Sequence, residues 1–238
     1  EEKSRGIVAY SSGNHAQAVA YASNLIGVQT TIVMPKNAPS IKINNTRKYG
    51  AEILLYDSMH ESREKIALEI AHKENKTIIK PYDDLDVIAG QGTVGKEIAE
   101  ELKLINIQPD IYLCCCGGGG LIAGSSTYLK HAFPNINNFA VEPEEFNDTQ
   151  LSLKNNSFMA NKKSAKSICD ALLAPQPGNI TFPINQTTLS GGLAVSDEEV
   201  KKTIIELAED MKIVAEPGGA VAATALLTNK INVKNKNI

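Results

Sequence analysis

The stretch that decides the fold spans residues 109–124 and reads PDIYLCCCGGGGLIAG. Its residues 111–116 form an apolar run, which is typical of a central strand buried on both faces. Four consecutive glycines follow at 117–120, and a helix-forming run begins directly after them. Glycine loses more conformational freedom on folding than any other residue, so four in a row indicate a place where a side chain would collide with something. At a strand-to-helix turn we expect that something to be a phosphate held by backbone N–H groups, with a plain flexible turn as the alternative.

This glycine turn differs from the two common nucleotide-binding patterns. No Gly-Lys-Ser/Thr follows it, as a Walker loop requires, and the spacing to a later ribose-binding acid fits a dinucleotide fold poorly. The three adjacent cysteines before it, Cys114, Cys115 and Cys116, lack the spacing of a zinc or disulfide framework. We therefore interpret them as core residues, and the reduced thiols favour a cytoplasmic protein.

A second strand-to-helix junction lies at residues 6–20, GIVAYSSGNHAQAVA. Between the apolar run and the helix stand two hydroxyls, a glycine, an amide and an imidazole, in the order Ser11, Ser12, Gly13, Asn14, His15. One interpretation is that Ser12 or Asn14 caps the helix. The other is that consecutive N–H groups and the hydroxyls form a nest for a carboxylate or phosphate. The motif alone leaves both open.

Along the whole chain, strand patterns alternate with helix patterns, which predicts a parallel α/β fold. We expect strands at 6–10, 30–34, 52–56, 77–80, 111–116 and 138–141, and helices at 15–26, 41–49, 58–73, 89–104, 121–131, 197–211 and 219–228. Gly27 and Gly50 are predicted to end helices in the left-handed conformation. The pattern favours two open parallel sheets flanked by helices. We place a smaller α/β domain at 5–83 and part of a larger one at 84–238.

The composition excludes several classes of protein. Of the 238 residues, 42% are hydrophobic and 21% charged, and the net charge is −3. That balance is typical of an ordinary globular protein and argues against a nucleic-acid partner. No apolar stretch reaches the ~18 residues that a membrane span needs, so we expect no membrane association.

Several motifs, taken together and in order, resemble the fold type II pyridoxal-phosphate enzymes, which share the tryptophan synthase β-like fold. The motifs are Ser-Ser-Gly-Asn-His-Ala-Gln at 11–17, Pro-Ser-Ile-Lys at 39–42, Arg-Lys-Tyr-Gly-Ala-Glu at 47–52, Ala-Gly-Gln-Gly-Thr at 89–93, the tetraglycine turn, and Glu-Pro-Gly-Gly-Ala at 216–220. The resemblance covers nearly the whole chain. It is strongest to the threonine/serine dehydratase and serine racemase branch.

The resemblance implies roles for individual residues. Ser11, Ser12, Gly13, Asn14 and His15 would hold the substrate carboxylate. Asn14 would also bond the ring hydroxyl of pyridoxal 5′-phosphate, and Ser12 would exchange a proton on the second face of the substrate α-carbon. The cofactor phosphate would be bound by Gly117, Gly118, Gly119, Gly120 and the N–H of Leu121.

The same resemblance implies a divalent-cation site in the stretch VEPEEFND at 141–148. Glu142, the carbonyl of Phe146 and Asp148 match the spacing of that site, and two carboxylates with a carbonyl suit Mg²⁺ or Ca²⁺. A solvated acidic loop is the alternative. Glu216 would head a loop near the cofactor.

The lysine that carries the cofactor in this family is not visible. Lys3-Ser4-Arg5-Gly6 imitates part of its motif, but Lys3 precedes the strand whose far end carries Ser11, about 25 Å away at ~3.3 Å per residue. The Ser-Gly-Gly-Asn turn that faces the pyridine nitrogen in relatives is also missing. We therefore expect an internal fragment, truncated at both ends, that is inactive by itself.

The function expected of the full-length protein is that of a pyridoxal-phosphate-dependent threonine/serine dehydratase. Such an ammonia-lyase converts L-threonine or L-serine to a 2-oxo acid and ammonia by α,β-elimination. The alternatives within enzymes are serine racemase and 3-hydroxyaspartate ammonia-lyase. A non-catalytic ligand-binding relative, which would truly lack the lysine, is the alternative from another class. We expect a small hydroxy amino acid as substrate and a homodimer or homotetramer.

Overall fold

The structure is a computed structural model that describes residues 5–238, and its chain divides into two compact units, Glu1–Pro81 and Tyr82–Ile238. The division falls two residues before the boundary predicted from the sequence. Lys3, in the stretch that imitates the family's lysine motif, lies outside the described residues.

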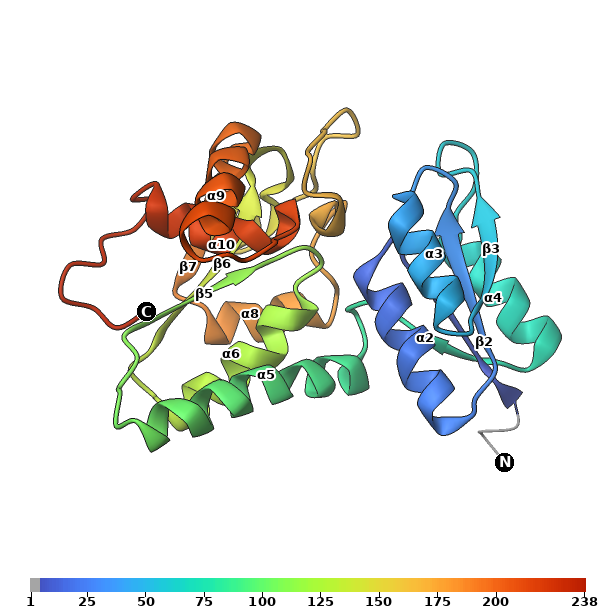
Figure 1. Cartoon of the computed structure of the whole chain (residues 1–238), viewed down its shortest axis with the longest axis horizontal. Helices are drawn as coiled ribbons and strands as arrows, with labels where there is room; N and C mark the ends of the chain where they lie inside the picture. The colour runs from blue at the N-terminus through green and yellow to red at the C-terminus, as the bar shows by residue number, and fades with distance from the viewer. Residues whose placement is uncertain (1–4) are drawn as a thin grey trace. The chain divides into compact units, whose positions relative to one another are not determined.

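The first unit is a four-stranded parallel sheet with helices on both faces (Figure 1). Its strand order is β3-β2-β1-β4. The strands are β1 Ile7–Tyr10, β2 Thr30–Pro35, β3 Glu52–Tyr56 and β4 Thr77–Ile79, and the helices are α2 Asn14–Ile26, α3 Ser40–Lys48 and α4 Arg63–Glu74.

Side chains alternate across this sheet, as the two-residue period of a strand requires. Ala9, Ile32 and Met34 pack in one cluster with α2 residues. Val8 and Val33, their neighbours in sequence, pack in the other cluster with Ala67 of α4. The first sheet is therefore buried on both faces, which is why its central strands read as continuous apolar runs.

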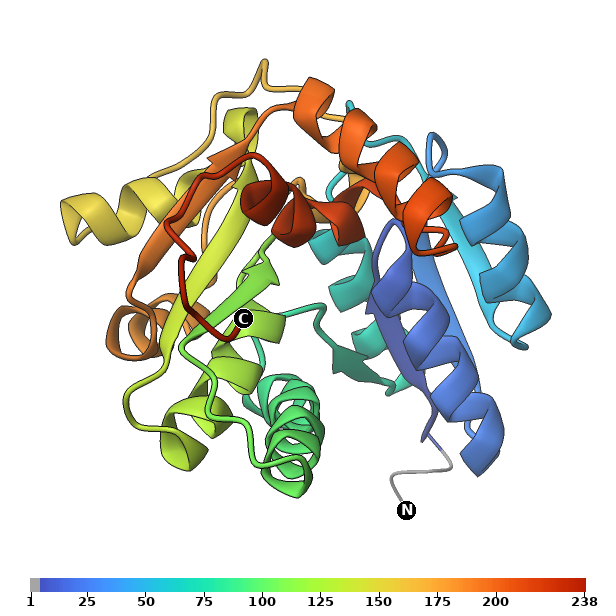
Figure 2. The same ribbon diagram turned by 60° about the vertical axis from the view of Figure 1, so that its left-hand side comes forward.

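The second unit contains a three-stranded parallel sheet in the order β5-β6-β7. The strands are β5 Ile111–Cys115, β6 Asn137–Pro143 and β7 Gly191–Val195, and the α-helices are α5 Leu85–Leu104, α6 Gly120–Ala132, α7 Asp148–Asn155, α8 Thr181–Thr188, α9 Asp197–Asp210 and α10 Pro217–Leu227. Short 3₁₀ helices, η1 Glu144–Phe146 and η2 Asp170–Leu172, complete it. Helices α9 and α10 lie side by side (Figure 2).

The three adjacent cysteines divide between the two faces of this second sheet. Cys114 and Cys116 are buried in a cluster with Ile122 of α6. Cys115 packs on the opposite side, against the cluster that contains Val221 of α10. Their interpretation as core residues is confirmed.

Most predicted elements are present, with differences at their ends. Gly27 and Gly50 take positive φ angles of 70° and 92°, as predicted for residues that end helices. The helix expected from residue 58 begins instead at Arg63, because the Ser62 side chain accepts a hydrogen bond from the amide of Lys65 and caps it. β7, α7 and α8 were not predicted.

Glycines bring α5 and α6 into close contact. A Cβ added to Gly124 of α6 would collide with the carbonyl oxygen of Ile88 and would lie 2.6 Å from the amide nitrogen of Gly92, both backbone atoms of α5. A Cβ on Gly95 of α5 would collide with the carbonyl of Ser125. The Gly-Gln-Gly-Thr motif at 90–93 therefore lies on a helix whose crossing requires small residues.

Two alanine substitutions of glycine should accordingly have opposite effects on stability. Gly124→Ala should lower the free energy of unfolding by about 1–3 kcal/mol, because backbone atoms cannot move aside. Gly90→Ala is the matched control: nothing lies within 4 Å of its added Cβ. That change should raise stability by roughly 0.5–1 kcal/mol through helix propensity. Urea denaturation measures both, and equal effects at the two positions would contradict the packing described.

Candidate active site

The Ser-Ser-Gly-Asn-His turn lies at the carboxyl end of β1. The amide of Ser11 continues the sheet by donating to the carbonyl of Val33 at 3.1 Å, and the Ser11 hydroxyl accepts from the amide of Gly13 at 3.2 Å. Helix α2 begins at Asn14 with Gly13 as its N-cap, and no side chain caps it. The capping interpretation of Ser12 or Asn14 is therefore wrong: the backbone enters the helix one residue earlier than predicted, and the cap position holds a glycine.

Two contacts join this turn to other elements of the first unit. The His15 ring nitrogen Nε2 lies 3.3 Å from the carbonyl oxygen of Ile79, which ties the turn to β4. Lys42 of α3 is 9% exposed, and its Nζ lies 3.1 Å from the point that a Cβ on Gly13 would occupy. No role was predicted for Lys42, although it lies in the Pro-Ser-Ile-Lys motif at 39–42. A positive charge at this turn is consistent with an anionic ligand.

In the second unit, the tetraglycine turn connects β5 to α6, and protein atoms fill the space that its missing side chains leave. A Cβ on Gly118 would collide with the ring of Tyr82, and one on Gly120 would lie 2.9 Å from the Tyr82 Cα. A Cβ on Gly119, whose φ is +89°, would lie 2.7 Å from the Asn185 amide nitrogen. The expectation that a phosphate occupies this space is therefore corrected. The Cβ positions face the protein, so what the turn offers a ligand is its backbone.

The amides of this turn have no partner inside the described residues. Across residues 5–238, no hydrogen bond is donated by the backbone N–H of Gly117, Gly118, Gly119, Gly120 or Leu121. These groups stand at the N-terminus of the 13-residue helix α6, where the helix dipole favours an anion. The arrangement fits the phosphate of pyridoxal phosphate, because buried N–H groups normally find an acceptor.

The carbonyls of the same turn, by contrast, are hydrogen-bonded within the protein. The carbonyl of Gly118 accepts from the Thr181 hydroxyl at 2.7 Å, and that of Gly119 accepts from the amide of Ala123 at 3.0 Å. The turn therefore has satisfied acceptors and unsatisfied donors.

The three predicted cation-site residues at the end of β6 and in the segment after it are buried. Glu142, Phe146 and Asp148 are 0%, 8% and 1% exposed, so the alternative of a solvated acidic loop is wrong for these residues. The Glu142 carboxylate accepts from the amides of Thr149 at 2.9 Å and Gln150 at 2.8 Å, and it therefore caps α7. The Asp148 carboxylate accepts from the Asn161 side chain through Oδ1, while its Oδ2 is buried without a partner in the described part of the chain.

Burial raises the pKa of both Glu142 and Asp148. It raises the pKa of Glu142 well above its ordinary value, and the charge of Asp148 raises it further. Burial also raises the pKa of Asp148 to about 7. Two buried carboxyl groups close together need a proton or a cation between them. The Asp148 Oδ2 has no partner among residues 5–238 and can bind either one, so this donor set is compatible with a divalent cation.

Glu216 lies directly before α10, at its N-cap, and Pro217 is the first helical residue. Its carbonyl accepts from the amides of Gly219 and Ala220, as expected at a helix start. The observed geometry explains the Glu-Pro-Gly-Gly-Ala motif as a helix N-terminus.

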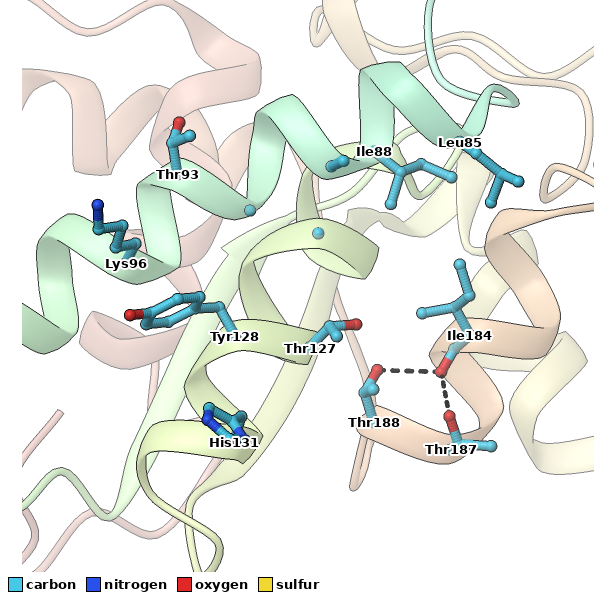
Figure 3. A pocket seen from close by; sticks show the side chains of 13 residues that line it. Leu85, Ile88, Thr93, Lys96, Thr127, Tyr128, His131, Ile184, Thr187 and Thr188 are labelled. Carbon is cyan, nitrogen blue, oxygen red and sulfur yellow. Dashed lines mark hydrogen bonds between the residues drawn. The ribbon is translucent and has the colours of Figure 1, made fainter.

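A separate cavity of about 710 Å³ lies among α5, α6 and α8 of the second unit (Figure 3). Its lining is largely apolar, and the hydroxyls of Thr187 and Thr188 both donate to the carbonyl of Ile184. None of the predicted site residues lines it.

No helix in the described chain, residues 5–238, has the length and apolarity that spanning a membrane requires.

Comparison with known proteins gives consistent matches over the full chain. The family described as "Pyridoxal-phosphate dependent enzyme" matches residues 1–238. Serine racemase of Schizosaccharomyces pombe is 40% identical over 237 residues, which cover 100% of this chain and 72% of the relative. L-threo-3-hydroxyaspartate ammonia-lyase of Saccharomyces cerevisiae is 40% identical over 238 residues, with the same coverage of 100% and 72%.

Solved structures agree in fold. The crystal structure of a threonine deaminase from T.th. superimposes with a TM-score of 0.90 at 35% identity, covering 95% of this chain and 73% of that chain. The two parallel sheets flanked by helices therefore have the predicted tryptophan synthase β-like architecture.

The buried Asp148 predicts a specific dependence of stability on pH when a chelator keeps divalent cations away. Because its pKa is raised in the folded state, the folded protein retains a proton that the unfolded chain releases between about pH 4 and pH 7. Stability should therefore fall as the pH rises through that range, by up to about 1.4 kcal/mol per pH unit from this group. Asp148→Asn should remove this part of the slope.

The measurement is urea denaturation of wild type and variant across that range of pH. Glu144→Gln, a change to an exposed acid of the same loop, is the control and should leave the wild-type slope in place. Identical slopes for wild type and Asp148→Asn would show that Asp148 does not titrate as described.

Proposed function

Because the chain belongs to the pyridoxal-phosphate-dependent enzyme family, within its threonine/serine dehydratase and serine racemase branch, we propose that the protein is a dehydratase for small hydroxy amino acids. The reaction is α,β-elimination of L-threonine or L-serine to a 2-oxo acid and ammonia. The observation that carries the proposal is the glycine turn, whose amides lack acceptors within residues 5–238 at the start of α6.

In this proposal, the residues of the second unit hold the phosphate of the cofactor. The amides of Gly117, Gly118, Gly119, Gly120 and Leu121 donate to its oxygens, supported by the dipole of α6. Bound pyridoxal phosphate supplies the electron sink of the reaction, while the protein supplies orientation and electrostatics.

The residues of the first unit bind and orient the substrate. The Ser11–Gly13 hydrogen bond shapes the turn, and the backbone N–H groups at the start of α2 bind the α-carboxylate. Gly13 lets Lys42 approach, so that the lysine adds positive charge to this binding turn. Asn14 bonds the ring hydroxyl of the cofactor, and His15 holds the turn through the carbonyl of Ile79.

Serine racemase is the second candidate, and the Ser12 hydroxyl favours it. Ser12 is half-buried, and its hydroxyl makes no hydrogen bond to any residue of the described chain. A hydroxyl so placed can exchange a proton with the substrate α-carbon on the second face. The identity of 40% is the same to the racemase and to the hydroxyaspartate ammonia-lyase, so 3-hydroxyaspartate also belongs among the candidate substrates.

We also propose that Glu142, the Phe146 carbonyl and Asp148 bind Mg²⁺ or Ca²⁺. The support is the pair of buried carboxyl groups and the partnerless Asp148 Oδ2. Homo-oligomerisation and a cytoplasmic location complete the proposal; the latter is supported by the free thiols Cys114, Cys115, Cys116 and Cys169.

The test is an assay of the protein expressed from its complete gene. L-threonine, L-serine and L-threo-3-hydroxyaspartate are supplied in turn with pyridoxal phosphate, and 2-oxo acid and D-serine are measured. We expect 2-oxo acid from at least one substrate and an absorbance band of the bound cofactor. A protein that binds no cofactor and forms neither product would contradict the proposal and favour a non-catalytic relative.

Ser12 variants separate the two candidate activities in the same assay. Ser12→Ala should reduce D-serine formation roughly 100-fold or more, the usual contribution of a positioned acid or base, and should reduce elimination much less. Ser12→Thr, which keeps the hydroxyl, is the control. Equal losses of both activities in Ser12→Ala would remove the second-face role of this residue.

A further inference from the structure

Hydrogen bonds from buried groups fix the orientation of the peptide plane that joins Gly118 to Gly119. The Gly118 carbonyl accepts from the Thr181 hydroxyl at 2.7 Å and from the amide of Gly178 at 3.3 Å, and Thr181 is fully buried. In a planar trans peptide the C=O and the following N–H point in opposite directions. Thr181 therefore directs the N–H of Gly119 away from α8.

The next peptide plane is held in the same way. The Gly119 carbonyl accepts from the amide of Ala123 at 3.0 Å and faces the Asn185 Nδ2 at 3.4 Å. Asn185 is also fully buried, and its amide nitrogen lies 2.7 Å from where a Cβ on Gly119 would be. The N–H of Gly120 consequently points away from Asn185.

The fixed orientation of these two peptide planes matters for anion binding because the turn consists of glycines. A glycine peptide has access to conformations with either sign of φ, so it can rotate at little steric cost. A rotated peptide would present a carbonyl oxygen where an N–H is needed, and a carbonyl repels an anion. The orientation of these two planes therefore decides whether the turn attracts or repels a phosphate.

Thr181 is itself held in place by a distant residue. The Asp83 carboxylate accepts from the amide of Ile180 at 2.7 Å, and Asp83 also borders Gly178 closely enough that a Cβ there would collide with it. The residues before and at the start of α8 are thus tied to the segment that leads into α5.

We propose that Thr181 and Asn185 of α8 are positioning residues that set the affinity for the phosphate group of the cofactor by fixing the glycine peptides whose N–H groups bind it. This inference rests on the proposed function, since it assumes that the turn binds the phosphate. Neither side chain need touch the cofactor. Their effect is transmitted through the carbonyls of Gly118 and Gly119.

The experiment compares two ligands that differ only in the phosphate, using the protein expressed from its complete gene. Dissociation constants for pyridoxal phosphate and for pyridoxal are measured by equilibrium dialysis in wild type, Thr181→Val and Thr181→Ser. Valine keeps the shape of threonine but removes the donor. Serine keeps the donor and is the matched control.

Thr181→Val should bind pyridoxal phosphate about tenfold more weakly, because the Gly118 carbonyl then keeps only the longer hydrogen bond from the Gly178 amide and its peptide plane is held less firmly. Its affinity for pyridoxal should stay within about twofold of wild type. Thr181→Ser should restore most of the affinity for pyridoxal phosphate. Asn185→Leu should show the same selective loss, so the inference remains testable if Thr181→Val does not fold.

Two results would overturn the inference: unchanged affinity for pyridoxal phosphate in folded Thr181→Val and Asn185→Leu, or equal losses for both ligands, which would indicate a purely structural role. A wild-type protein that binds neither ligand would instead contradict the proposed function. Wild-type affinities distinguish the two failures.

Discussion

The structure of the second unit depends on one constraint, which is that the peptides of the glycine turn keep their carbonyls toward the protein and their amides outward. The constraint arises at the carboxyl end of β5, an edge strand of the three-stranded sheet, where the chain enters α6 without side chains because Tyr82, Thr181 and Asn185 occupy the space around it. Packing therefore makes the turn glycine-only. Satisfied carbonyls and unsatisfied amides then make it an anion site.

Parallel topology explains why polar groups gather where they do in each unit. Turns at the carboxyl ends of parallel strands meet helix N-termini, so ligand-binding groups collect at that edge of the sheet. In the first unit the edge carries the Ser11–His15 turn with Lys42. In the second unit it carries the glycine turn after β5, together with Glu142 near the end of β6 and Asp148 at the start of α7. The polar groups at these edges include a buried lysine, Lys42, in the first unit and two buried carboxyl groups, those of Glu142 and Asp148, in the second.

The alternation of strands and helices was sufficient to predict the fold class, because long periodic segments such as α5 and α9 carry strong patterns. Elements that depend on tertiary contacts escaped prediction. The eight-residue α7 is polar and is capped by Glu142 from β6, and α8 is short, contains a proline and is held against the glycine turn. The segment Gly191–Val195 pairs as a strand despite its two glycines, because β6 provides a template.

In the candidate site, too, local motifs could be predicted from the sequence, whereas features that depend on tertiary contacts could not. Backbone motifs were visible in the sequence, since serine, asparagine and glycine at a strand end have few structural explanations. The supporting side chains Lys42, Tyr82, Thr181 and Asn185 were not assigned, because their roles depend on contacts with residues far away in the sequence. Burial of Glu142 and Asp148 was equally invisible, since an acidic stretch such as Glu-Pro-Glu-Glu reads as solvated until packing encloses part of it.

The most direct measurement of the central claim follows the amides of the glycine turn themselves. In the protein expressed from its complete gene and labelled with ¹⁵N-glycine, titration with pyridoxal phosphate should shift the amide resonances of Gly118, Gly119 and Gly120 and slow their hydrogen exchange. Pyridoxal, which lacks the phosphate, should leave these resonances nearly unchanged. If pyridoxal phosphate binds while these amides neither shift nor gain protection, the turn is not the phosphate site and the account is wrong.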